Sequence, residues 1–134
     1  MSASPGLGSL PGQSVDVLVV DDNGSVRSTM AEILRESGYS VETAEDGDVA
    51  LDVLHRCSVG MMLLDLQMPH RDGLSVLEAL TTPQLVVLVS AYSLDAATRA
   101  RTEAKVVTCL EKPVKPRRLL EMVARTLGRS VAGC

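Results

Sequence analysis

The stretch Val15–Asp22, which reads VDVLVVDD, joins an apolar run to a pair of aspartates and decides the fold. The apolar part has the length and character of a β-strand. The same arrangement recurs later in the chain, where Asp65 follows Met61–Leu64 and Lys112 lies just beyond Val106–Leu110. Because the carboxyl ends of parallel strands share one edge of an open α/β sheet, we expect these polar side chains to meet there.

Apolar segments of strand length alternate with longer segments of helical period, which predicts a parallel sheet built from βαβ units. The predicted strands are Val15–Val20, Ser40–Thr43, Met61–Leu64, Leu85–Val89 and Val106–Leu110. The predicted helices are Ser25–Ser37, Asp46–Arg56, a short one around Leu74–Leu80, one near Leu94–Lys105, and Pro116–Leu127. We expect the fourth helix to be the most loosely held, because it directs mainly alanines inward, namely Ala97, Ala100 and Ala104. With strand order 2-1-3-4-5, strands one and three are neighbours at the topological switch point.

Composition limits the class of protein. A chain of 134 residues with 46% hydrophobic content suits one domain with its own core. A net charge of −4, with no basic run longer than Arg117-Arg118, gives no footprint for direct nucleic-acid binding. No apolar stretch approaches the roughly 20 residues that span a bilayer. The three cysteines, Cys57, Cys109 and Cys134, match neither a disulfide framework nor a zinc pattern, which favours a reducing cytoplasm.

The two ends of the chain differ from its middle in composition. Residues 1–14, MSASPGLGSLPGQS, are rich in Ser, Gly and Pro, and they predict a flexible tail rather than a signal peptide. The folded domain is expected over residues 15–127, followed by a short tail at 128–134. Because that tail is too short to be a DNA-binding or enzymatic output domain, we expect either a single domain that acts by docking on a partner or one domain of a larger protein.

The acidic residues predict a metal site. Asp21, Asp22 and Asp65 would crowd together at the edge of the sheet, where a hard divalent cation with oxygen ligands relieves their repulsion. Magnesium is the expected ion, and a lysine beside such a site indicates phosphoryl chemistry. Each residue also has a structural alternative: the aspartate pair as a helix cap, Ser90 as a strand-end hydroxyl, and Lys112 as a surface lysine.

Four motifs at the predicted strand ends resemble the receiver domain of two-component response regulators. They are the Asp21-Asp22 pair, LLDLQMPHRDG from Leu63 to Gly73, Ser90 in Val89-Ser90-Ala91-Tyr92, and Glu111-Lys112-Pro113. The resemblance covers about Val15 to Leu127 and implies a flavodoxin-like α/β fold. It also implies that a sensor histidine kinase or a histidine phosphotransfer protein donates a phosphoryl group to the aspartate that ends strand three, which here is Asp65.

The same resemblance assigns roles at the metal site. Asp22 and Asp65 would bind Mg²⁺, Asp21 would act directly or through water, and the backbone carbonyl of Gln67 would add a ligand. Such a protein is not an enzyme in the ordinary sense. It would catalyse only its own phosphorylation and its own slow hydrolysis.

The resemblance also implies how the phosphoryl group is held and read. Ser90 would hydrogen-bond to a phosphoryl oxygen and Lys112 would pair with its charge, and inward movement of Ser90 would be the switch. Many receivers carry an aromatic residue three positions before this lysine, where the present chain has Cys109. Tyr92 is a second gating candidate, and we predict that Tyr92→Ala changes the autodephosphorylation rate more than magnesium affinity.

Two other classes of protein remain as alternatives. A haloacid-dehalogenase-like phosphatase needs a second aspartate two positions after the first, and because Gln67 occupies that position, catalytic turnover on a substrate phosphate is disfavoured. A receiver-like interaction module that is never phosphorylated would be favoured by failure to bind magnesium. For either kind of receiver, we expect the fourth helix, fifth strand and fifth helix to make contacts with an unknown output partner or in a homodimer.

Overall fold

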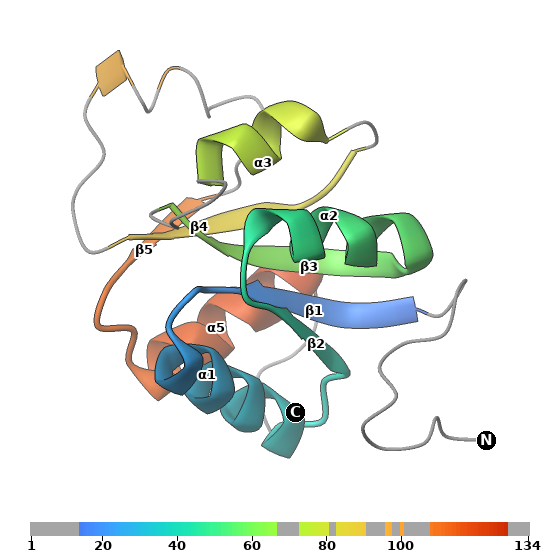
Figure 1. Ribbon diagram of the computed structural model, residues 1–134. Coiled ribbons are helices and arrows are strands. Elements are labelled where there is room, and N and C mark those ends of the chain that lie inside the picture. Colours follow the sequence, from blue (N-terminus) through green and yellow to red (C-terminus); the bar gives the residue numbers. More distant parts are fainter. Residues whose placement is uncertain are drawn as a thin grey trace.

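A computed structural model describes residues 14–66, 73–80, 83–90, 96–97, 100 and 108–128. These residues form a five-stranded parallel sheet in the order β2-β1-β3-β4-β5, with helices on both faces (Figure 1). The strands are β1 Ser14–Val20, β2 Val41–Ala44, β3 Ser58–Asp65, β4 Val86–Ser90 and β5 Thr108–Glu111. The helices are α1 Gly24–Glu36, α2 Gly47–Arg56, α3 Gly73–Ala79 and α5 Pro116–Leu127. The predicted fold class and strand order are confirmed.

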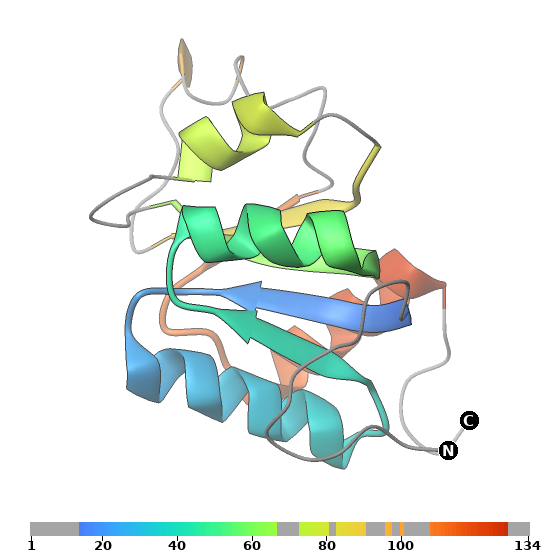
Figure 2. The same ribbon diagram turned by 45° about the vertical axis from the view of Figure 1, so that its right-hand side comes forward.

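The sheet separates two apolar clusters. Helices α1 and α5 cover one face, and α2 and α3 cover the other, as both ribbon views show (Figures 1 and 2). Successive residues of β3 alternate between the clusters: Met61 and Leu63 pack under α1 and α5, whereas Met62 and Leu64 pack under α2 and α3. Burial on both faces is why this strand reads as a continuous apolar run.

The helices begin and end at residues suited to those positions. Asn23 and Asp46 cap α1 and α2, each accepting a hydrogen bond from a backbone N–H three residues on, at 3.1 and 2.9 Å. Gly38 follows α1 with φ of 94°, and Gly128 ends α5 with φ of 73°, a left-handed conformation that glycine adopts readily. Within the described ranges, no helix combines the length and apolarity needed to cross a membrane.

Strand boundaries differ from the predictions in two informative places. β3 begins at Ser58 rather than Met61, because Ser58 and Val59 pair with the first residues of β1. This end of the strand is partly exposed, so its residues need not be apolar, and hydrophobicity alone misses them. β4 is shifted by one residue to end at Ser90, and Leu85, predicted to begin this strand, lies before it and is 44% exposed.

Of the predicted fourth helix, the structure describes residues 96, 97 and 100. Ala97 and Ala100 are helical but exposed, so the expectation that they face the core is wrong. A methyl group buries too little apolar area to hold a helix face inward. Ala104, the other inward alanine predicted there, lies outside the described residues, as does the predicted start of the fifth strand.

Candidate functional site

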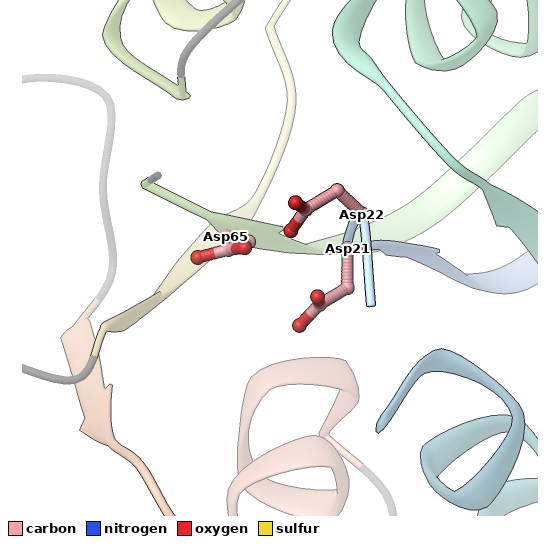
Figure 3. A group of neighbouring side chains, drawn as sticks. All are labelled: Asp21, Asp22 and Asp65. Atoms are coloured by element: carbon pink, nitrogen blue, oxygen red, sulfur yellow. The ribbon is translucent and has the colours of Figure 1, made fainter. Parts of the chain in front are cut away.

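Three aspartates converge at the carboxyl edge of the sheet. β1 and β3 are adjacent, and Val20 pairs with Leu64, so the next residues, Asp21 and Asp65, lie side by side. Asp22 follows in the connection to α1, and Figure 3 shows the three side chains pointing into one region. One carboxylate oxygen from each lies within 4.8 Å of the other two. The structure therefore brings together the acidic residues on which the predicted metal site depends.

The three carboxylates differ in burial and in their contacts. Asp21 is fully buried and Asp65 is 4% exposed, whereas Asp22 is exposed. The Oδ1 atom of Asp21 accepts a hydrogen bond from the backbone N–H of Asn23 at 2.9 Å. Its Oδ2 atom is buried and accepts no hydrogen bond of good geometry from the described residues. A buried charged oxygen in this state calls for a cation.

Lys112 supplies positive charge between two of the carboxylates. Its Nζ lies 3.0 Å from Asp21 Oδ2 and 3.5 Å from Asp65 Oδ1. Partial burial lowers the pKa of Lys112, but contact with Asp21 and then with Asp65 outweighs burial and holds the pKa above its usual value. The lysine is therefore charged at neutral pH.

Ser90 reaches the same edge from β4. It is 5% exposed, and its strand pairs with β3 so that Val89 lies opposite Asp65. Its carbonyl accepts a hydrogen bond from the backbone N–H of Lys112 at 2.7 Å, which ties the ends of β4 and β5 together. The backbones of Ser90 and Lys112 are thereby held together at the ends of β4 and β5, from which the Lys112 side chain extends to Asp21.

The remaining candidate residues are placed differently. Gln67 and Tyr92 lie outside the described residues. Cys109 lies on β5, opposite Leu88 of β4, three residues before the site lysine. It is exposed on the surface of the domain. The peptide bond between Lys112 and Pro113 is cis.

The donor set suits a hard divalent cation. Carboxylate oxygens are the ligands that magnesium takes in proteins, and one or two of them suffice beside water and phosphate oxygens. Among the described residues, the three carboxylates face a single ammonium group, that of Lys112, so the cluster keeps an excess of negative charge. The acidic cluster can therefore bind a metal ion.

Sequence reasoning missed two residues that shape the site. Asn23 both caps α1 and donates to Asp21, and its residue type just before a helix was an available signal. The guanidinium of Arg27 donates from Nη1 to the backbone carbonyl of Asp21 at 2.8 Å. No sequence pattern points to this second contact.

Comparison with known proteins agrees with this geometry. Residues 17–124 match the family model described as "Response regulator receiver domain". The chain belongs to this family. It is a receiver domain of two-component signalling with an acidic pocket formed by Asp21, Asp22 and Asp65, and it is not a conventional enzyme. A receiver implies a cognate histidine kinase.

Individual relatives place the receiver among regulators. It is 33% identical over 118 residues to the transcriptional regulatory protein CpxR of Escherichia coli K12, covering 85% of this chain and 50% of the relative. The chain thus spans about half the length of that curated relative. It is 44% identical over 78 residues to the response regulator MprA of Mycobacterium tuberculosis H37Rv, covering 57% of this chain and 34% of the relative.

Solved structures of other receivers share the fold. The CheY-like receiver domain protein from Methanospirillum hungatei superposes with a TM-score of 0.77 at 27% identity, covering 90% of this chain and 95% of the other. The receiver domain of NtrX from Brucella abortus gives 0.75 at 30% identity, covering 86% of this chain and 100% of the other.

Proposed function

We propose that this receiver accepts a phosphoryl group from a partner phosphohistidine onto Asp65 and that this changes its affinity for an output partner. The observation that carries the proposal is the position of Lys112, whose Nζ lies between the carboxylates of Asp21 and Asp65. Phosphoryl transfer depends mainly on an in-line nucleophile and on neutralisation of the transferred oxygens, and these residues offer both.

The proposed step uses the Asp65 carboxylate as nucleophile. One of its oxygens attacks phosphorus, a P–O bond forms, the P–N bond of the phosphohistidine breaks, and the departing imidazole takes up a proton. Lys112, 3.5 Å from Asp65 Oδ1, would pair with the phosphoryl charge, and the Ser90 hydroxyl would donate to one of its oxygens. Attack of water on the same phosphorus later returns the free carboxylate and inorganic phosphate.

Magnesium is the cation that we propose for the acidic cluster. Asp21, Asp22 and Asp65, with the backbone carbonyl of Gln67, would hold it. When bound, the ion supplies positive charge that orients the phosphoryl group and stabilises charge on its oxygens. The excess of negative charge supports this assignment, because among the described residues three carboxylates face one ammonium group, that of Lys112.

An apolar groove beside the site supports a protein donor. It has a volume of about 580 Å³ and runs from Lys112 between α1 and the segment that leads into α5. We propose that the sensor histidine kinase or a histidine phosphotransfer protein docks along this groove with its phosphohistidine toward Asp65. The apolar lining residues are Val26, Met30, Ile33, Pro113, Val114 and Pro116.

Several wider features belong to the same proposal. The receiver unit would span residues 15–127, with tails at 1–14 and 128–134, and it would act in the cytoplasm. Output would come from contacts of the surface that includes β5 and α5, with a partner or with a second copy of the chain. The identity of that partner is separate from the chemistry at Asp65.

The proposal is tested by incubating the protein with magnesium and acetyl phosphate and recording its intact mass. We expect one phosphoryl group on the wild type and none on Asp65→Asn. Asp48→Asn is the matched control, because it removes an exposed carboxylate on α2, outside the acidic cluster. Addition of EDTA should abolish the reaction in the wild type and in Asp48→Asn.

Two results would count against the proposal. Phosphorylation of Asp65→Asn at the wild-type level would remove Asp65 as acceptor. No phosphorylation of the wild type by acetyl phosphate or by a cognate kinase would favour the interaction module that is never phosphorylated.

A further inference from the structure

Arg27 binds the backbone of the acidic cluster rather than its carboxylates. β1 ends at Val20, and the N–H of Asp21 still bonds to the Ala44 carbonyl of β2 at 3.2 Å. The Asp21 carbonyl that follows is bound by Arg27 Nη1 at 2.8 Å. The other terminal nitrogen of Arg27 lies 3.6 Å from where a Cβ on Gly24 would be, so the guanidinium folds back over the first turn of α1.

This contact matters most for Asp22. The Asp21 carboxylate is held by the Asn23 N–H and by Lys112. Among the described residues, no hydrogen bond or ion pair holds the exposed Asp22 carboxylate, so its position depends on its backbone. Because a peptide unit is planar, binding the carbonyl of Asp21 also orients the nitrogen and Cα of Asp22.

We infer that Arg27 is a positioning residue for the metal site: its hydrogen bond to the Asp21 carbonyl directs the Asp22 carboxylate toward Asp21 and Asp65. The inference rests on the proposed metal-dependent function. Partners one step removed from a metal commonly change its affinity by about 10-fold to 100-fold when they are lost.

The direction of the change in metal affinity distinguishes a positioning role of Arg27 from a purely electrostatic one. A guanidinium near a metal site repels the incoming cation, so removing it should strengthen metal binding if charge alone mattered. Loss of a group that positions Asp22 should weaken metal binding. The two explanations therefore predict opposite changes in affinity for the same substitution.

The chain offers a matched control on the same helix. Arg35 also donates a guanidinium hydrogen bond to a backbone carbonyl, that of Val41, at 3.0 Å. Its acceptor lies six residues later in the chain, whereas that of Arg27 lies six residues earlier. Val41 begins β2, and Ala44, three residues later at the end of that strand, accepts a hydrogen bond from Asp21. Because a strand rises about 3.3 Å per residue, the Arg35 contact lies roughly 10 Å from the site. Arg27→Met and Arg35→Met each remove one such bond, but only the first touches the acidic cluster.

The experiment titrates Mn²⁺ into the wild type and both variants and follows the free-ion signal by electron paramagnetic resonance, with Mg²⁺ as competitor. We expect Arg27→Met to weaken Mn²⁺ binding about tenfold, the low end of the range for such partners, and Arg35→Met to leave it unchanged. Circular dichroism melting of each variant shows whether both are folded. Arg27→Lys keeps a charge and a single donor, so it should have intermediate affinity.

Each outcome decides a separate point. Unchanged or tighter binding in Arg27→Met, or equal weakening in Arg35→Met, overturns the inference while the proposed function stands. If Arg27→Met does not fold, wild-type affinity in Arg27→Lys overturns the inference and reduced affinity supports it. A wild type that binds no Mn²⁺ and does not become phosphorylated overturns the proposed function together with the inference.

Discussion

Replacing Lys112 with methionine removes the cation that lies between Asp21 and Asp65 and leaves an apolar side chain of similar length. At an effective dielectric constant of about 20, Coulomb's law gives about 5.5 kcal/mol for the 3.0 Å contact and about 4.7 kcal/mol for the 3.5 Å contact. Desolvation of the ammonium offsets much of this attraction. Breaking a buried pair by removing one partner typically costs 3–5 kcal/mol, and the Lys112 side chain is 24% exposed, so we expect a loss of about 3 kcal/mol.

The assay is urea unfolding followed by far-ultraviolet circular dichroism at neutral pH, because the chain has no Trp to report by fluorescence. In EDTA, Lys112→Met should unfold at a clearly lower urea concentration than the wild type. Magnesium should restore much of the difference, since the cation can then occupy the place of the ammonium, and the variant should bind magnesium more tightly.

Lys115→Met is the control for the loss of a lysine as such. Lys115 is exposed and its side chain makes no capping hydrogen bond to α5. We expect its unfolding midpoint to match the wild type with or without magnesium. Equal stability of Lys112→Met, Lys115→Met and the wild type in EDTA would refute the argument that Lys112 compensates the buried carboxylates.

Three further outcomes follow from the geometry. Because the pKa of Lys112 is raised in the folded state, its contribution to stability is complete below the unfolded-state pKa of about 10.4 and is lost as pH rises through the folded-state pKa. Urea unfolding of the wild type above pH 10 should therefore show a decline in stability that Lys112→Met lacks. Gly73→Ala should lower the free energy of unfolding by about 2 kcal/mol, because a Cβ there would lie 2.8 Å from the Asp65 carbonyl oxygen. Gly24→Ala is the control, since a Cβ there meets no backbone atom, and thermal melts should show a lower melting temperature for Gly73→Ala alone. Asn23→Ala should lose about 1 kcal/mol with the cap of α1, measured by urea unfolding, and equal stability would show that the cap contributes nothing.

Much of the site was predictable because parallel strands end together. Asp21 and Asp65 follow apolar runs in neighbouring strands, so their convergence needs only the strand order and not the details of packing. Ser90 and Lys112 reach the same edge for the same reason, from β4 and from just beyond β5. Polar residues directly after buried strands thus predict a shared site even when the predicted strand boundaries are wrong by one or two residues.

Other features depend on tertiary contacts that no short pattern contains. Arg27 has a long side chain with many rotamers, and only the folded strand end supplies the carbonyl that selects one of them. The exposure of Ala97 and Ala100 also escaped prediction, because alanine is compatible with either face of a helix. The early start of β3 depends on partners in β1 and not on the hydrophobicity of Ser58 or Val59.

The sheet divides the apolar interior into two clusters that can accumulate substitutions independently during evolution. The cluster under α1 and α5 and the cluster under α2 and α3 share a backbone layer but draw on alternate side chains. Substitutions more than about 7–10 Å apart with no common partner usually have additive effects on stability. A lineage could therefore remodel the outer surface and packing of α2 and α3 while leaving the opposite layer undisturbed, so that new partners are acquired on one side without loss of fit on the other.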